Sequence, residues 1–341
     1  MLSFTAMNNP PSTLNNQPST NWYSLTPAGP IAIGNLTPVG QNSGQVGCRW
    51  PPNGHQLAAC LNLPRDCQLL GPFWYFDTNL YVPLPQPVYT FDTKNDPTQQ
   101  IYRLQWHQQR WRVQPDHQDQ DIEIVGGKYL ISGNSLKAFW NAGKSTSPKL
   151  KHLPWQTLTL SHNHRDEDFQ VKEEAGFFAE MTTLMDTKWS MLVKVIGDYT
   201  PPNWSILGAG GTPVAIAPVR SKGWDWLEAD CPHSTGAVLL TGALWQKQPL
   251  KCSVPYPPTA IKAYAADRGI PWQSWKKVRA KATLGDSHQP QKRVQVLTPG
   301  EWLTPAGAVY LWDGVAPVQK SGPFPDPFQR HVLGYGHLWL F

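Results

Sequence analysis

The chain has 341 residues, a length that fits two domains or one large one. It carries 29 lysine and arginine residues against 24 aspartate and glutamate residues. The net charge of +5 is compatible with a polyanionic partner without requiring one. The sequence contains no run of about 18 apolar residues and no basic start followed by an apolar core. We therefore expect no membrane span, no signal peptide and a cytoplasmic location.

The residue types narrow the class of protein further. Only 16% of the residues are charged, whereas tryptophan reaches 17 and proline 34. Prolines interrupt helices, and flat tryptophan faces either fill a core or stack on nucleobases. The five cysteines include no CxxC pair, which argues against a disulfide framework or a zinc knuckle and suits a reducing compartment. No metal site and no cofactor are predicted.

The start of the chain contains a polar tail and then a proline-containing loop. Residues 1–20 are rich in Asn, Pro, Ser and Thr, cannot bury much surface, and are predicted to form a disordered tail. Order is expected to begin near Asn21. Further along, Pro51-Pro52 stiffens a loop, and Asn53 behind it is a candidate N-cap for a short helix over residues 56–61.

Basic and aromatic residues alternate between Ile101 and Arg112. That mixture is typical of a nucleic-acid surface, and the alternative is a solvated strand face on which arginine stems cover apolar surface. A second basic stretch, residues 128–151, contains a predicted short helix bracketed by Asn134 and Gly143.

The segment from His162 to Asp168 combines two histidines with carboxylates. Such residues could bind a metal or supply general acid and base groups, but an exposed hairpin tip is the favoured interpretation. The apolar, β-branched run over residues 189–196 predicts a central strand. Pro201-Pro202-Asn203 then marks the predicted boundary between two domains. Residues 207–211 are glycine-rich without the Lys-Ser/Thr of a P-loop, and a tight turn is predicted there.

The second half contains the most basic part of the chain. Residues 259–267 are predicted to form a short helix. Six cations and a single acid, Asp286, then follow Trp272 directly; the cations are Lys276, Lys277, Arg279, Lys281, Lys292 and Arg293. This imbalance beside tryptophans favours contact with a polyanion over a merely solvated face.

Near the end of the sequence, Gly334-Tyr335-Gly336 precedes an apolar strand. Glycines permit positive φ and close backbone approach. Exposed amide N–H groups of such a turn could seat a sugar-phosphate backbone, although a plain β-turn before an edge strand is the alternative. Short strands with few and short helices predict an α+β, sheet-dominated chain with domains over residues 21–202 and 203–341.

The order of several short motifs resembles the third-subunit family of the Cmr complex, the type III-B CRISPR effector. That family belongs to the group-five-like branch of the RAMP superfamily, and the resemblance spans residues 21–341. The motifs are Arg49-Trp50-Pro51-Pro52-Asn53, Gly71-Pro72-Phe73, Pro83-Leu84-Pro85, residues 128–133, 174–178, 238–241 and 305–310, and Gly334-Tyr335-Gly336.

The resemblance implies two ferredoxin-like (RRM-like) domains with antiparallel sheets and long irregular insertions. It also implies a non-catalytic subunit that binds the 5′ handle of the guide RNA and docks the large polymerase-like subunit and the first backbone subunit. The family's Pro-Pro loop falls on Pro51-Pro52, and its glycine loop falls on Gly334 and Gly336. The glycine loop is shorter here, and Cys60-Leu61-Asn62 stands where the family usually has an arginine.

The predicted RNA-binding residues are cations, polar side chains and the glycine loop. They are Arg49, Asn53, Arg103, Arg110, Arg112, Lys128, Lys137, His164, Arg165, Lys276, Lys277, Arg279, Lys281, Gly334, Tyr335, Gly336 and His337. The alternative function is a guide-RNA-processing endoribonuclease of the same superfamily. It would draw its general acid, base and cation from His162, His164, His337, Lys137 and Arg165.

Overall fold

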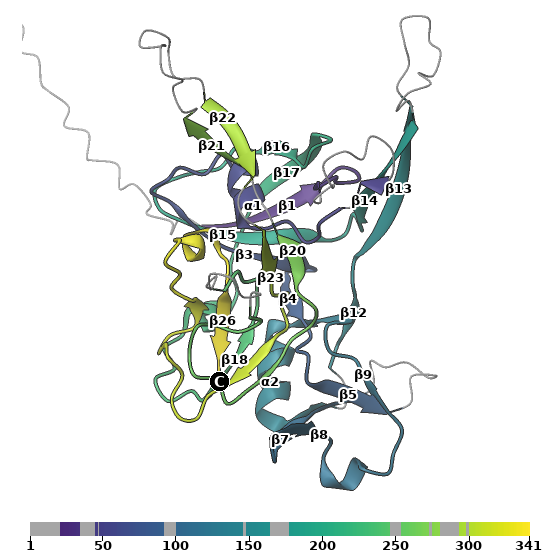
Figure 1. The fold of residues 1–341 in the computed structure, drawn as a ribbon, viewed down its shortest axis with the longest axis vertical. Helices are drawn as coiled ribbons and strands as arrows, with labels where there is room; N and C mark the ends of the chain where they lie inside the picture. Colours follow the sequence, from purple (N-terminus) through teal and green to yellow (C-terminus); the bar gives the residue numbers. More distant parts are fainter. Residues whose placement is uncertain are drawn as a thin grey trace, which may run out of the picture.

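The computed structural model describes residues 21–34, 45–46, 48–91, 100–145, 148–163, 177–245, 254–272, 275–279, 293–297 and 300–341. These residues form two α-helices, α1 (Gly54–Cys60) and α2 (Gly133–Ala142), and many short strands that pair mostly antiparallel (Figure 1). The prediction of an α+β chain dominated by antiparallel sheets is confirmed. The predicted tail, His164, Arg165 and Lys281 lie outside the described residues.

The largest sheet has eight strands in the order β12-β10-β4-β3-β15-β1-β17-β16. Their bounds are β1 Trp22–Pro27, β3 Gln68–Phe76, β4 Asn79–Pro83, β10 Tyr129–Ser132, β12 Lys151–His152, β15 Ser190–Ile196, β16 Trp204–Leu207 and β17 Thr212–Val219. The β-branched run predicted as a central strand is β15, which pairs with β3 and β1. Because β16 and β17 join this sheet, it includes residues from both sides of the predicted boundary at 202/203; the division into two domains stays a prediction.

A second sheet has five strands in the order β19-β24-β18-β26-β25. Their bounds are β18 Gly236–Leu239, β19 Ala263–Ala265, β24 Val309–Leu311, β25 Gly322–Pro323 and β26 His337–Leu340. The helix predicted over residues 259–267 is wrong, because β19 occupies its centre and Tyr264 pairs with Tyr310 of β24. Strand pairing overrides the helical preference of the alanines in this segment.

The remaining strands form small sheets and hairpins. A four-stranded sheet has the order β11-β6-β5-β9, and a three-stranded one has the order β13-β14-β2. Their bounds are β2 Gln45–Val46, β5 Val88–Phe91, β6 Ile101–Arg103, β9 Ile122–Ile124, β11 Lys144–Ser145, β13 Trp155–Asn163 and β14 Phe177–Met185. Three two-stranded units are β7 (Gln105–His107) with β8 (Arg110–Arg112), β20 (Ile270–Trp272) with β23 (Glu301–Leu303), and β21 (Trp275–Arg279) with β22 (Arg293–Leu297).

The two larger sheets share one hydrophobic core. Its buried residues include members of β1, β3, β4 and β15 of the first sheet and of β18, β24 and β26 of the second. Trp224 packs edge-on against Trp22 with ring centroids 5.0 Å apart, and Trp226 packs against Trp339 at 5.7 Å. Many of the tryptophans are therefore core residues, and burial of such large rings is a main source of stability.

Both helices lie where the sequence predicts them, but their bounds differ. Helix α1 covers Gly54–Cys60 instead of residues 56–61, and the N-cap of α2 is Ser132 instead of Asn134. The Asn53 side chain accepts from backbone amides at the start of α1, and Gln56 completes a capping box. Helix α2 is capped by the Ser132 hydroxyl and ends at Gly143. Its buried face contains Leu136, Phe139 and Trp140. Within the described ranges, no helix is long and apolar enough to cross a membrane.

Candidate functional site

The Gly-Tyr-Gly turn lies between a short 3-10 helix, η4 (Arg330–Leu333), and β26. Gly334 has a φ of +81° and Gly336 a φ of +70°. A Cβ atom on Gly334 would lie 2.5 Å from the carbonyl oxygen of Gly71 in β3. The turn thus needs glycine at position 334 for two reasons, a left-handed conformation and close approach to the backbone of β3.

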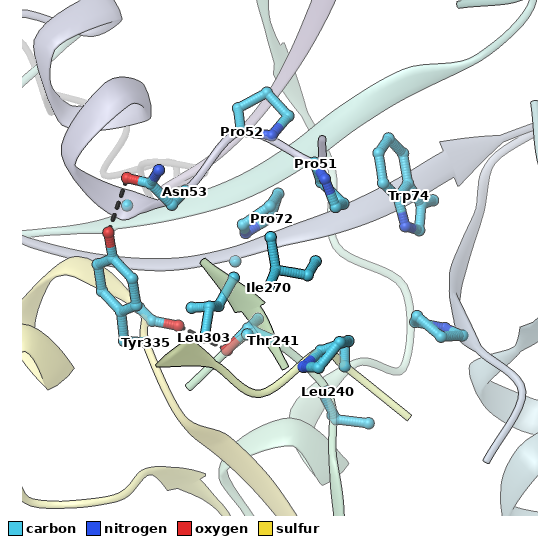
Figure 2. A pocket seen from close by; sticks show the side chains of 17 residues that line it. Pro51, Pro52, Asn53, Pro72, Trp74, Leu240, Thr241, Ile270, Leu303 and Tyr335 are labelled. Carbon is cyan, nitrogen blue, oxygen red and sulfur yellow. Dashed lines mark hydrogen bonds between the residues drawn. The ribbon is translucent and has the colours of Figure 1, made fainter. Parts of the chain in front are cut away.

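The side chain of Tyr335 joins this turn to the Pro-Pro loop. Its hydroxyl donates a hydrogen bond of 2.7 Å to Oδ1 of Asn53, drawn in Figure 2, and its oxygen lies 2.8 Å from Nδ1 of His55. Burial is the main reason why the pKa of Tyr335 is raised well above its usual value. Two of the motifs behind the family resemblance, about 280 positions apart, therefore meet through one buried hydroxyl.

The amides of the two glycines are used inside the protein. Gly334 N–H donates to the carbonyl of His331 at 3.0 Å, and Gly336 N–H donates to that of Gly242 at 3.1 Å. The Thr241 hydroxyl donates to the Gly334 carbonyl at 2.6 Å. The expectation that these glycine amides are exposed donors for a sugar-phosphate backbone is wrong, because the turn closes onto the segment after β18.

We call the contact between the Pro-Pro loop, the glycine loop and β20–β23 the junction. A small pocket lies within it, lined by proline rings and by Asn53, Thr241 and Tyr335 (Figure 2). Its volume is about 70 Å³. This is far below the range of about 300–1,000 Å³ that is usual for small-molecule sites, so the pocket is too small for a nucleotide.

A buried ion-pair network lies beside the junction. Arg330 of η4 is buried, and its guanidinium donates to Glu301 at 2.8 Å and to Asp326 at 2.5 Å. Burial by itself would raise the pKa of Asp326, but its hydrogen bonds from Arg330 reverse the effect and leave this pKa lowered. The network fixes η4, and η4 leads directly into the glycine loop.

Arg49 connects the junction with the basic hairpin. Its guanidinium carbon lies 5.2 Å from the centre of the Trp272 ring, and that ring packs edge-on against Tyr335 at 6.1 Å. Trp272 ends β20, which β21 follows, so the strand carrying Lys276, Lys277 and Arg279 starts at the junction. The β21–β22 hairpin extends from it at the top of Figure 1.

The other predicted cations lie elsewhere. Arg110 and Arg112 are exposed on β8, at the opposite end of the molecule from β21–β22 (Figure 1). Arg103 packs over the Trp140 ring at 5.0 Å, and Lys137 lies over Trp226 at 5.7 Å. Lys128 pairs with Glu123 at the surface at 2.6 Å. The structure therefore does not bring the described members of the predicted RNA-binding set together at one surface.

Among the predicted histidines, His337 is one whose surroundings the structure describes. His337 is fully buried, and its Nε2 donates to the carbonyl of Leu227 at 2.8 Å. Burial is the main cause that lowers the pKa of His337 to about 4. His162 belongs to β13, which pairs antiparallel with β14, and the rest of the predicted hairpin tip, residues 164–168, lies outside the described residues. In the part of the chain that the structure describes, no three His, Cys, Asp or Glu side chains are grouped as metal ligands.

Several residues that build the junction were not predicted from the sequence. His55, Thr241, Trp272 and Arg330 reach it from four separate elements. A possible signal was the position of His55, two residues after the predicted N-cap. Trp272 carries a local signal only as a neighbour of the basic segment. Thr241 and Arg330 carry none, because their roles depend on contacts between distant segments.

No family model matches the sequence, and no curated protein matches it significantly. Among solved structures, the chain is similar to the type III-B Cmr-β bound to cognate target RNA and AMPPNP. The identity is 10%, the match covers 85% of this chain and 86% of that chain, and the TM-score is 0.43. A structure of Cmr-β bound to cognate target RNA gives 10% identity, the same coverage and a TM-score of 0.41. The Csm3-Csm4 subcomplex of the type III-A CRISPR-Cas interference complex gives 8% identity, coverage of 86% and 94%, and a TM-score of 0.30. The resemblance derived from the sequence is to the same type III-B Cmr complex.

Proposed function

We propose that this chain is a non-catalytic subunit of a type III CRISPR ribonucleoprotein effector. In this role it binds the 5′ handle of the guide RNA at the junction and docks the large polymerase-like subunit and the first backbone subunit. The observation that carries the proposal is the hydrogen bond between Asn53 and Tyr335. It brings together the Pro-Pro loop and the glycine loop, two motifs whose order in the sequence carries the family resemblance.

The chemistry around the junction suits a single-stranded RNA end. The pocket is too small for a nucleotide, so RNA would lie on the outer surface, where Pro51 and His55 are exposed. The cations of β21 begin four residues beyond Trp272, at Lys276, and would hold phosphates. Aromatic and proline surfaces with adjacent cations are what unstacked bases and their backbone require.

The apolar edge of the large sheet supports the docking role. Strand β16 lies at the end of the eight-stranded sheet, and its Trp204 and Ile206 are 69% and 56% exposed. They lie opposite Ala215 and Pro213 of β17. Aromatic side chains are enriched in protein interfaces, where they act as anchors. An edge strand with such side chains is suited to a neighbouring subunit.

Co-purification tests the proposal. The tagged full chain is expressed with the genes that flank it and a CRISPR array, and the bound RNA is sequenced from its 5′ end. We expect the other effector subunits and guide RNAs that begin with repeat-derived sequence. Recovery of the chain with neither guide RNA nor effector subunits would refute the proposed function.

A separate experiment tests the absence of catalysis. The purified chain is incubated with labelled repeat RNA in EDTA, and the RNA should remain intact because the proposed role is binding. A site-specific product that disappears with His164→Ala would instead assign the chain to the guide-processing endoribonucleases.

A further inference from the structure

A second hollow, larger than the junction pocket, lies between the β7–β8 hairpin and the second sheet. We call it the tryptophan groove; its main lining residues are Arg103, Trp106, Trp111, Trp140, Trp312 and Phe341. Its volume is about 470 Å³. This volume falls within the range of about 300–1,000 Å³ that is usual for small-molecule sites. A nucleobase, which is too large for the junction pocket, has room in the tryptophan groove.

The groove is a built feature, held by specific contacts. Trp106 and Trp111 are directly paired across the hairpin, and their rings meet edge to face at 5.5 Å. Nε1 of Trp111 donates a hydrogen bond of 2.9 Å to the carbonyl of Tyr264 in β19. This bond fastens the hairpin to the second sheet and so fixes the wall of the groove. The two bonded residues are 153 positions apart in the sequence.

One end of the groove carries positive charge. Arg103 donates from Nη1 to the carbonyl of Trp140 at 2.8 Å and stacks over the same residue's ring. These two contacts hold the guanidinium in place. They use one of its nitrogens, so its other N–H groups remain as donors. Lys262 also lines the groove and pairs at 3.1 Å with exposed Asp313. The lining therefore has two cations, and Asp313 beside it neutralises one of them.

We propose that the tryptophan groove binds an unstacked nucleobase of single-stranded RNA, with the adjoining phosphates on Arg103 and on exposed Arg110 and Arg112 of β8. The proposal rests on RNA being the partner, as in the proposed function, but it concerns a different site. Trp106 and Trp111 line the groove and are only partly buried, so part of each ring is open to a ligand. Base–aromatic stacking tolerates any sequence and is strengthened by nearby arginine.

A peptide is a less suitable occupant. The cations of the groove would repel a basic peptide. A proline-rich peptide could pack on the tryptophans but would leave the positive charge of the groove without a partner. RNA uses both, because each nucleotide offers a flat ring and a negative phosphate.

The test measures binding of a labelled oligouridine, which lacks any handle sequence, to the full chain at low ionic strength by fluorescence anisotropy. Trp106→Ala should weaken binding roughly five- to hundredfold, the range expected for one lost stacking contact. Phe328→Ala, which removes an exposed aromatic ring outside the groove, is the matched control and should leave the affinity unchanged. A denaturation curve for each variant shows that it is folded.

Crosslinking gives a second measurement that does not depend on a variant. Oligouridine with 4-thiouridine should crosslink to peptides from residues 103–112. Unchanged affinity in folded Trp106→Ala, crosslinks confined to other peptides, or binding of a proline-rich peptide in the groove without RNA would overturn the proposal. If the wild-type chain binds a repeat-handle RNA but Trp106→Ala has no effect on oligouridine, only the groove fails. If the chain binds neither RNA, the proposed function fails as well.

Discussion

The hydroxyl of Tyr335 donates a hydrogen bond of 2.7 Å to the side-chain oxygen of Asn53, which also caps helix α1. Both residues are buried. One oxygen therefore stabilises a helix terminus and the contact between two distant loops. Residues around this bond determine the stability of the junction, and several of them allow a quantitative test.

Replacing Tyr335 and replacing Asn53 should destabilise the protein by different amounts. Tyr335→Phe removes two hydrogen bonds, to Asn53 and with His55, and should cost about 2 kcal/mol. Asn53→Ala removes the cap, worth about 1 kcal/mol, and also leaves a buried tyrosine hydroxyl without its acceptor, for a total of about 3 kcal/mol. Urea denaturation measures both losses. Tyr264→Phe, at a half-exposed tyrosine, is the control and should have no effect. Equal losses for the two variants would show that the shared oxygen has no special role.

The two glycines of the loop should respond differently to alanine. At Gly336 a Cβ atom would come no closer than 3.6 Å to the Trp245 ring, so Gly336→Ala costs only the left-handed conformation, about 1–2 kcal/mol. At Gly334 the same atom would also lie 2.5 Å from the Gly71 carbonyl oxygen. Gly334→Ala should therefore cost more than about 4 kcal/mol or prevent folding. Thermal unfolding ranks the two variants, and similar transition temperatures would contradict the close packing of the loop on β3.

Stability should fall in mild acid because of His337. Its folded-state pKa of about 4 lies below the usual 6.5, so the unfolded chain binds the proton more tightly. The contribution is fully present above about pH 6.5 and is lost as the pH falls toward 4. Between pH 7 and pH 5 the loss is about 2 kcal/mol. The physical cause is burial, and Nδ1 has no hydrogen-bond partner among the described residues, so a proton there would be unsatisfied.

The variant His337→Gln isolates this effect from the titration of carboxylates. Glutamine keeps an N–H donor for the carbonyl of Leu227 but does not titrate. The difference in unfolding free energy between pH 7 and pH 5 should be about 2 kcal/mol smaller in the variant than in the wild type. An identical pH dependence in both proteins would show that His337 is protonated in the native state at the lower pH.

Local features of the fold could be predicted from the sequence. The helix behind Asn53 follows from a cap and a glutamine three positions later, and β15 follows from one β-branched apolar run. The same reasoning failed over residues 259–267, where alanines indicate a helix. There Tyr264 pairs with Tyr310. A local sequence pattern cannot indicate this pairing, because 45 residues lie between the two tyrosines.

The candidate site was only partly predictable, for the same physical reason. The sequence identified Asn53 and Tyr335 separately, each through a short motif. Their contact, and the stacking of Arg49 on Trp272, depend on how two sheets pack together. The tryptophans show the limit most clearly, because composition alone does not distinguish buried Trp224 from partly exposed Trp106.

The buried ion pairs of Arg330 should matter far more than those at the surface. Arg330→Met leaves Glu301 and Asp326 without their shared cation in a largely buried position, and we expect a loss of about 3–5 kcal/mol. Lys128→Ala breaks an exposed pair with Glu123 and should cost less than about 1 kcal/mol. Chemical denaturation at pH 7 compares them. A small loss for Arg330→Met would mean that solvent reaches the carboxylates.

The basic hairpin should supply the salt-dependent part of RNA binding. The triple variant Lys276→Ala/Lys277→Ala/Arg279→Ala removes three cations from β21, the strand that starts at the junction. If each neutralises one phosphate of a single strand, the slope of log affinity against log salt should fall in magnitude by about 2, since each contact contributes about 0.7. The matched control removes the same charges from exposed positions elsewhere, Lys149→Ala/Lys188→Ala/Arg220→Ala. A titration of labelled handle RNA at several salt concentrations separates the two variants. Because both lose the same net charge, a slope that falls equally in both would assign the effect to overall charge and remove the hairpin from the RNA surface.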